Sequence, residues 1–375
     1  MWPYLVLYLS AAFIAYSAPR VAISGKRRRP GALVGALIIL TIFIGFRDHV
    51  GGDWFAYILY MRNAASSTFD EVLIRKEPGY EILNWMSAQL GFGIWSVNVV
   101  SALIFSSGLI AFCREQPRQW LALAVAIPYI VIVVAMGYTR QSIALGLEML
   151  GLVALLRESY PIATIYAGLA VAFHTSALAL LPLPALVARR NKYLTMLSLI
   201  FVGGVVYYLV SEKTTDYLVT TYVTNISKTM QSEGALIRLM MNLVPASLLL
   251  IWRKRFQFNE NEARLWIIFA VSAFVLMAVY IATPASTAVD RIGLYVLPLQ
   301  IVVFARLPDI FYVKPRPARS RKFQGLPTQP DRNARLIVMA VLVYYGAALI
   351  IWLSFGNYST YWQPYRFYLF EEASL

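Results

Sequence analysis

Long apolar runs separated by short polar segments make up most of the chain. Runs suited to helices lie at about 4–19, 31–46, 94–113, 120–137, 140–157, 161–173, 175–188, 193–210, 236–252, 264–282, 291–307 and 336–355. A helix needs about 20 largely apolar residues to cross a hydrocarbon core about 30 Å thick. The pattern predicts an all-α polytopic membrane protein with about 12 transmembrane segments, forming a single domain over 1–375.

The region 161–188 decides the topology. It fits either one long tilted helix or a short helical hairpin that turns at 173–176. Short cytoplasmic loops collect Lys and Arg. With a hairpin and an extracytoplasmic N-terminus, most Lys and Arg face the cytoplasm, whereas a single crossing would move the basic loops 253–255 and 314–335 outside. The charge pattern therefore favours the hairpin and places both termini on the extracytoplasmic side.

Three long segments are then expected outside, at about 47–93, 211–235 and 356–375, and each is rich in Tyr, Trp and Asn. Within the first, the stretch 80–92 has apolar residues at helical spacing, which predicts a helix lying in the membrane interface. The segment 308–335 carries five prolines and many basic residues. It is expected to be a flexible cytoplasmic loop that faces lipid headgroups.

Composition supports the membrane class and excludes others. The chain is 59% hydrophobic and 14% charged, whereas a soluble domain carries about a quarter charged residues. The net charge of +14 does not indicate nucleic acid, because no basic platform stands outside the hydrophobic segments. The one cysteine, Cys113, excludes an internal disulfide and a cysteine-based metal site.

Four arginines break the expected charge pattern, because they lie at the outer ends of predicted spans: Arg47, Arg140, Arg238 and Arg291. Arg140 and Arg291 stand at or near helix starts, where a cation opposes the helix dipole. A charged side chain at the membrane is costly unless it is paired or functional. Snorkelling to lipid phosphates would account for a single arginine, but four together favour an anionic phosphate ligand, which guanidinium groups bind well.

The first outer segment carries two carboxylates of interest. Gly51 and Gly52 permit a tight turn that would present Arg47 and Asp53 to one site; the alternative is an ordinary turn with Asp53 as the helix N-cap. Glu77 precedes a turn and a helix, where a lone glutamate is more often a cap or a solvated charge.

His174 lies at the tip of the predicted hairpin. A lone histidine in apolar surroundings is usually structural, but a helix break at membrane depth is tolerated only beside protein or a wet cavity. The position favours a catalytic or ligand-binding role, and an unperturbed pKa of about 6.5 suits a general base. Tyr295 follows Arg291 by one turn at the start of the eleventh span. Glu148, near mid-membrane, is expected to be protonated, bundle-facing and structural.

Several of these residues form an ordered set of motifs that resembles the EpsG family of Wzy-type exopolysaccharide and O-antigen polymerases. The set comprises Arg47 with Gly51-Gly52-Asp53-Trp54 and Tyr57, then Glu77-Pro78-Gly79-Tyr80, then Arg140-Gln141-Ser142-Ile143-Ala144, and then Phe173-His174-Thr175-Ser176-Ala177. Thr139 stands where family members often carry Asn. The C-terminal third matches mainly through Arg291 and Tyr295.

The resemblance implies polymerisation of undecaprenyl-pyrophosphate-linked repeat units at the outer face of a bacterial inner membrane, in a bundle similar to metal-independent GT-C glycosyltransferases. It implies no metal and no cofactor. The partners implied are the lipid-linked donor and acceptor glycans, membrane lipid, a flippase and a chain-length regulator, and no nucleic acid.

The roles that follow form one mechanistic hypothesis. The residues expected to be catalytic are His174, Arg140, Arg291, Asp53 and Glu77. Those expected to bind substrate are Arg47, Arg238, Gln141, Tyr57, Tyr80 and Tyr295. The arginines would clamp the pyrophosphate, and His174, Asp53 or Glu77 would act as general base. The tyrosines at positions 57 and 80, with aromatic residues of the tail, would stack on sugar rings.

Three alternatives stay open. A ligase would transfer a finished glycan to another acceptor by similar chemistry. A flippase or transporter of lipid-linked sugars would usually show symmetric repeats and a mid-membrane site, and no repeat is evident here. A membrane scaffold of a secretion complex would have no need of outward-facing arginines or of His174.

Overall fold

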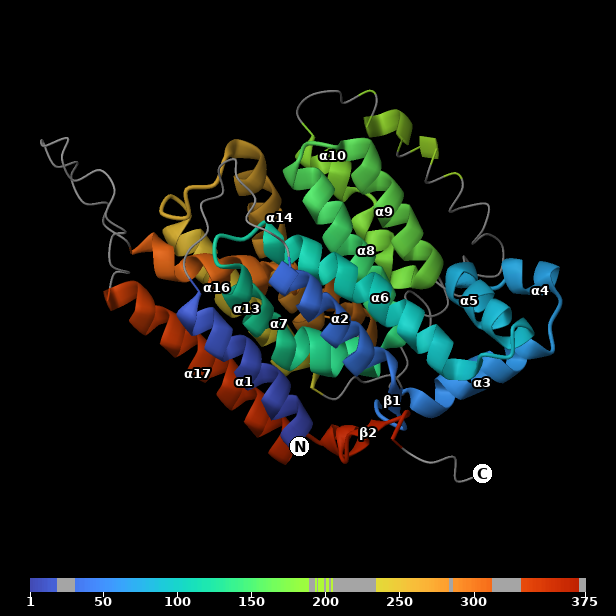
Figure 1. Ribbon diagram of the computed structural model, residues 1–375. Helices are drawn as coiled ribbons and strands as arrows, with labels where there is room; N and C mark the ends of the chain where they lie inside the picture. Colours follow the sequence, from blue (N-terminus) through green and yellow to red (C-terminus); the bar gives the residue numbers. More distant parts are fainter. Residues whose placement is uncertain are drawn as a thin grey trace, which may run out of the picture.

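The computed structural model of the protein describes residues 1–18, 31–188, 193, 195–198, 200–201, 204, 234–282, 286–311 and 332–370. Within these residues almost all regular structure is helical, and strands β1 (Arg47–Asp48) and β2 (Arg366–Phe367) form the one small sheet. The prediction of an all-α protein is confirmed (Figure 1). The predicted span 193–210, segment 211–235 and loop 308–335 lie largely outside the described residues.

Each predicted span within the described residues has helix at its position. The helices are α1 (Trp2–Ser17), α2 (Gly31–Gly45), α6 (Gly93–Arg114), α7 (Gln119–Ala126), α8 (Thr139–Leu156), α9 (Tyr160–Phe173), α10 (Leu183–Val187), α13 (Ala235–Trp252), α14 (Glu260–Ala282), α15 (Ser286–Gly293), α16 (Pro298–Ile310) and α17 (Arg332–Phe355). By length and composition, six helical stretches in the described part of the chain can cross a membrane: α6, α8, α13, α14, α15 continued into α16, and α17. Five shorter apolar helical stretches accompany them. The chain is a multi-pass membrane protein, and the number of crossings and the side of the termini stay predictions.

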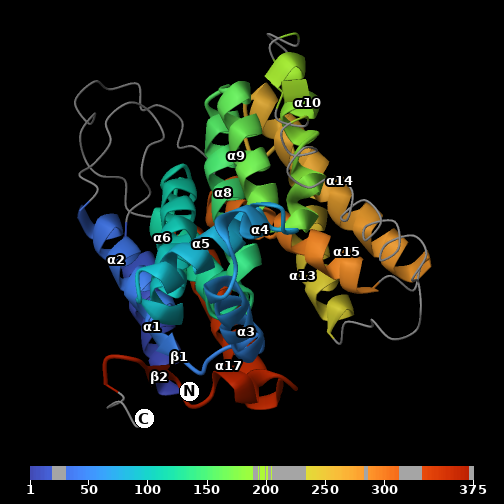
Figure 2. The ribbon, with the colours of Figure 1, turned by 90° about the vertical axis from the view of Figure 1, so that its right-hand side faces the viewer.

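The segment 47–93 folds into three short helices, α3 (Trp54–Ala65), α4 (Phe69–Leu73) and α5 (Pro78–Gln89). α3 and α4 both pack on α5, and the group lies at the start of α6 (Figure 2). α4 begins with a capping box, in which Thr68 and Glu71 exchange hydrogen bonds with each other's backbone N–H. The predicted helix at 80–92 is confirmed as α5.

The two most extensively packed helices, α6 and α8, cross at a pair of glycines. A Cβ at Gly108 would collide with the backbone carbonyl of Gly146, and one at Gly146 would lie 2.6 Å from the Cα of Phe105. Membrane helices lack a hydrophobic driving force for association, so close approach of backbones supplies the packing. The crossing holds α8, which carries Arg140, against the helix that follows α5.

The predicted hairpin is confirmed, with one correction. α9 ends at Phe173, and the chain folds back through the 3₁₀ helix η2 (Thr175–Leu180) and α10, which both pack against α9. The returning arm was expected to be a single α-helix. It is broken instead because Pro182 and Pro184 have no N–H to donate to the preceding turn. The hairpin tip at His174 is extended, with φ −152° and ψ 119°.

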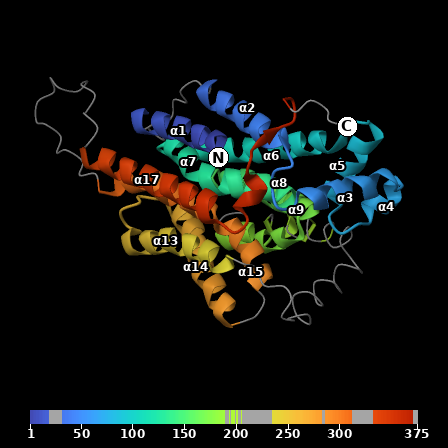
Figure 3. The ribbon, with the colours of Figure 1, turned by 90° about the horizontal axis from the view of Figure 1, so that it is seen from below.

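The C-terminal tail closes over the end of the bundle that carries the N-terminus (Figures 1 and 3). β2 pairs antiparallel with β1, so that Arg47 lies opposite Phe367. The Trp362 indole donates to the carbonyl of Ile132 (2.7 Å) in the π-helix η1 (Ile127–Ala135), and Tyr4 donates to the Trp362 carbonyl (2.6 Å). The tail thus ties the first outer segment to α1 and to the helix before α8.

Gly146→Ala should destabilise the protein by about 1–3 kcal/mol, the usual cost of overpacking a tight contact. Gly35→Ala is the matched control, because a Cβ there meets nothing within 4 Å. Thermal unfolding of the detergent-purified variants, followed by tryptophan fluorescence, measures the difference. Equal melting temperatures for the two variants would show that the α6–α8 crossing tolerates a side chain.

Candidate functional site

A partly buried ion pair joins the segment before α5 to the start of α8. Glu77, just before α5, accepts a hydrogen bond from Nη1 of Arg140 at 2.5 Å. Gly79 allows α5 to begin close to the end of α9, because a Cβ there would lie 3.0 Å from the carbonyl oxygen of Ala172. Glu77 occupies the N-cap position of α5 but makes no capping hydrogen bond. The carboxylate is therefore neither a cap nor a solvated charge.

The second oxygen of Glu77 holds the hairpin tip. Both the backbone N–H and the hydroxyl of Thr175 donate to Oε1 at 3.1 Å, and Nδ1 of His174 lies 3.6 Å from the same atom. Burial by itself raises the pKa of Glu77, but the His174 ring, the Arg140 guanidinium and the Thr175 N–H together outweigh it and hold this pKa below its ordinary value. The Glu77 carboxylate thus connects the start of α5 with the start of α8 and with the hairpin tip.

Aromatic rings surround the other side of Arg140. Its guanidinium carbon lies 4.6 Å from the ring centre of Tyr60 and 6.0 Å from that of Tyr57. Tyr57 in turn meets Tyr80 edge-on at 5.7 Å, and both of these rings are buried. This burial favours a role in supporting Arg140 over direct stacking on a sugar. Tyr60 was not singled out from the sequence, although its place one turn after Tyr57 was the available signal.

His174 is oriented by its own hairpin. The Ser176 N–H donates to Nδ1 at 3.3 Å, and the Ser176 hydroxyl lies 3.1 Å from the same nitrogen. That hydroxyl also reaches the Tyr295 hydroxyl at 3.3 Å. Because Nδ1 accepts from a backbone N–H, the proton of the neutral ring is on Nε2. Nε2 has no hydrogen-bond partner among the described residues.

Asp53 supplies a carboxylate without such contacts. It sits at the N-cap position of α3, as the sequence predicted, but makes no capping hydrogen bond. No described side chain donates to it, and it is half-buried. Burial raises its pKa, against the opposing charges of Arg140 and Arg291. The Asp53 carboxylate is therefore influenced by the charges of Arg140 and Arg291 but forms an ion pair with neither of them.

Arg291 requires a correction to its predicted place at a helix start. It lies in the last turn of α15, because helical structure already begins at Ser286. Because α15 continues into α16 as one helical stretch, Thr287–Ile310, Arg291 lies inside this stretch. Gln141 donates to the Arg291 carbonyl at 2.6 Å, which joins α8 to α15. The Arg291 side chain is exposed, and among the described residues no carboxylate pairs with it.

The other two arginines are held within the protein. Arg47 is only 1% exposed and donates to the Ile44 carbonyl (2.6 Å) and the Thr139 hydroxyl (2.8 Å). Arg238 makes a two-pronged pair with Asp290, with both contacts at 2.6 Å. Thr139, the residue before Arg140, thus couples Arg47 to the start of α8. An Asn side chain at position 139 could accept the same hydrogen bond from Arg47.

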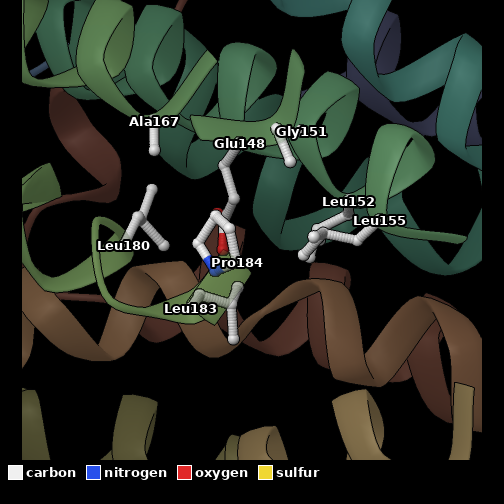
Figure 4. A pocket seen from close by; sticks show the side chains of 9 residues that line it. Glu148, Gly151, Leu152, Leu155, Ala167, Leu180, Leu183 and Pro184 are labelled. Carbon is white, nitrogen blue, oxygen red and sulfur yellow. The ribbon is translucent and has the colours of Figure 1, made fainter. Parts of the chain in front are cut away.

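Glu148 lies two turns beyond Arg140 on α8, facing the inside of the bundle as predicted. Both carboxyl oxygens are buried and have no hydrogen-bond partner. They face a cavity of about 20 Å³, measured as the space open to the centres of water-sized molecules (Figure 4). Its lining is apolar: Gly151, Leu152, Leu155, Ala163, Ala167, Leu180, Leu183 and Pro184. Such a space holds roughly one water.

Together these contacts define a multi-pass membrane protein with a charged site where α3, α5, α8, α15 and the hairpin tip meet. The site combines carboxylate, guanidinium and imidazole groups. In the described part of the chain, no three His, Cys, Asp or Glu side chains cluster closely enough to hold a metal ion.

Comparison with known proteins identifies the family. The EpsG family model matches residues 33–319, and the chain belongs to this family. The match supports a polysaccharide polymerase-type role for the protein. No curated protein and no solved structure matches the chain.

Glu77→Gln should lower the stability of the folded protein by up to about 3 kcal/mol, because it leaves the partly buried Arg140 without its counter-charge. The pKa of Glu77 is lowered on folding, so its contribution is complete above the ordinary carboxyl pKa and is lost as pH falls through the lowered value. Thermal unfolding measured from pH 7 to below the lowered pKa should therefore bring the wild type toward the variant at the acid end of the range. Asp70→Asn, at an exposed position of α4, is the control; an equally large effect there would remove the special role of Glu77.

Proposed function

We propose that the protein joins undecaprenyl-pyrophosphate-linked oligosaccharide repeat units into an exopolysaccharide or O-antigen-like polymer. The reaction would be a metal-independent glycosyl transfer at the outer face of a bacterial inner membrane. Family membership and the many apolar helices support a membrane-embedded polymerase. The observation that carries the proposal is that Gln141, the neighbour of Arg140, is hydrogen-bonded to the Arg291 carbonyl, which joins the elements of both cations, and that the charges of both oppose the burial-raised pKa of Asp53.

Arg140 and Arg291 would bind the donor pyrophosphate. Arg140 is pre-oriented by Glu77 and Tyr60, and Arg291 is exposed beside it with no described counter-ion. Guanidinium groups fixed where negative charge develops stabilise a departing pyrophosphate at low reorganisation cost. In this scheme Arg47 and Arg238 position the neighbouring elements, because their guanidinium groups already contact Thr139 and Asp290.

The chemical step forms one bond and breaks one. A hydroxyl oxygen of the acceptor glycan attacks the anomeric carbon of the donor, the bond from that carbon to the pyrophosphate oxygen breaks, and a general base takes the hydroxyl proton. Of the three candidate bases, Glu77 already uses both oxygens, and the accepting nitrogen of His174 faces Ser176. Asp53 is the best placed, and its burial-raised pKa makes it a better proton acceptor.

In this scheme His174 serves as a hydrogen-bond donor to the substrate. Its Nε2–H would bind an oxygen of the substrate, and the hydrogen-bonded chain through Ser176 and Tyr295 keeps the ring in position. Gln141, bound to the Arg291 carbonyl, keeps α15 against α8. Tyr57 and Tyr80 keep the Arg140 side chain in place.

Asp53→Asn should lower turnover by about 10²–10⁴-fold, the usual contribution of a general base. His174→Gln should lower turnover less, because glutamine retains a donor. The assay uses purified protein in nanodiscs with a synthetic undecaprenyl-pyrophosphate repeat unit and follows the product ladder in the presence of EDTA. Full activity of Asp53→Asn with loss in His174→Gln would make the histidine the base.

Arg140→Ala should abolish chain growth while the protein remains in the membrane, since the pyrophosphate loses a charged partner fixed in place. Arg62→Ala, exposed on α3, is the control. In cells, a polymerase defect accumulates single lipid-linked repeat units, whereas a ligase defect accumulates unattached full-length polymer, and loss of a flippase leaves units on the cytoplasmic face. Normal polymer length in Arg140→Ala would refute the role of this arginine.

A further inference from the structure

A second histidine lies outside the charged site, next to β1. Nδ1 of His49 lies 2.7 Å from Oδ2 of Asp48, whose carboxylate is almost fully buried. A carboxylate can only accept a hydrogen bond, so Nδ1 carries the shared proton, and in the neutral ring Nε2 is then the accepting nitrogen. The pair therefore holds the imidazole in one orientation with its accepting nitrogen turned away from Asp48.

The backbone at His49 is strained. Its φ of 52° is in the left-handed region, which a residue with a side chain rarely adopts. Such strain persists only where surrounding structure enforces it, and it concentrates at functional sites. Here the enforcing contacts are the pairing of β1 with β2 and the hydrogen bond from the Gly51 N–H to the Tyr361 carbonyl at 2.9 Å.

The imidazole stands among accessible aromatic rings. The side chain of His49 is 48% exposed. Its ring centre lies 5.6 Å from that of Trp54 and 6.1 Å from that of Phe55, and Phe55 is 70% exposed. Tyr361, bound through its carbonyl to Gly51, is also exposed and stacks on Tyr358 at 6.3 Å. The exposed ring of Phe55 and the imidazole of His49 are thus neighbours, and the backbone of Tyr361 contacts the same turn at Gly51.

This surface adjoins the charged site. Trp54 lies between the two, with its ring 5.9 Å from the Arg47 guanidinium on one side and near His49 on the other. Arg47 in turn donates to Thr139, the neighbour of Arg140. These contacts connect the His49 surface to the start of α8 through Trp54, Arg47 and Thr139.

We propose that His49, with the exposed rings of Phe55 and Tyr361, forms a binding subsite for a neutral sugar of the glycan. A sugar hydroxyl donates to Nε2 of His49, and the C–H face of the pyranose ring packs on an aromatic face, which carries partial negative charge. A few oriented polar groups among apolar surfaces are typical of small-molecule sites. The inference rests on the proposed function, because it assigns this surface to the same glycan substrate.

The chain has only two histidines, which makes the subsite measurable without any turnover. Diethyl pyrocarbonate modifies accessible imidazole nitrogens, so it should label His49 and spare the buried His174. His49→Gln should abolish the labelled peptide. The probe is the soluble repeat-unit oligosaccharide, freed of lipid and pyrophosphate, and it should slow labelling of His49 at least about fivefold at saturation. No protection by the oligosaccharide, or full protection by glycan-free lipid vesicles alone, would overturn the proposal and assign this surface to the membrane.

Steady-state kinetics of the polymerase reaction provide an independent test of the subsite. His49→Gln and Phe55→Ala should each raise KM for the lipid-linked repeat unit about tenfold, the factor expected for one lost hydrogen bond or ring contact, with kcat within about twofold. Asn63→Ala, exposed further along α3, is the control. An unchanged KM in both variants would refute the sugar subsite and would not affect the proposal that the protein is a polymerase. A wild-type protein without polymerase activity would instead refute the proposed function, and protection from labelling would still test the sugar site.

Discussion

The site depends on the ion pair between Glu77 and Arg140. Each oxygen of this carboxylate serves a different element, because one meets the start of α8 and the other meets the hairpin tip at Thr175. Such a pair stabilises a fold only when its desolvation is compensated by further hydrogen bonds, and here Thr175 and the ring of Tyr60 supply that compensation. The orientation of Arg140, and with it any grip on an anion, is set by residues that need not touch the substrate.

Sequence patterns were sufficient for the positions of the helices and for several side chains that the structure brings together at the charged site. Apolar periodicity and the distribution of Lys and Arg located the spans and the hairpin, because both reflect the bilayer as a solvent. The outward arginines and Asp53 also pointed to the charged site. The pattern could not separate Arg140 from Arg47, since both are outer arginines and only tertiary contacts reveal that Arg47 is 1% exposed.

Other features depend on distant contacts. The helical start at Ser286 moved Arg291 from the beginning of a helix to its last turn, and composition carries no signal for that shift. Tyr57 and Tyr80 were expected to face sugars, yet they are buried beneath Arg140, because a tyrosine serves equally well in an interface and in a core. His49 was passed over because its orientation comes from a left-handed turn that only the folded chain displays.

The tail also determines when the outer loop can take its final form. β1 has its partner in β2, and Trp362 fills the space beside Gly137 while bonding to η1. Because these partners are translated long after β1, the loop from Arg47 to Asp53 must wait for α17 to be inserted before its backbone is fixed. A partly synthesised chain would therefore form its helices before the backbone from Arg47 to Asp53 reaches its final conformation.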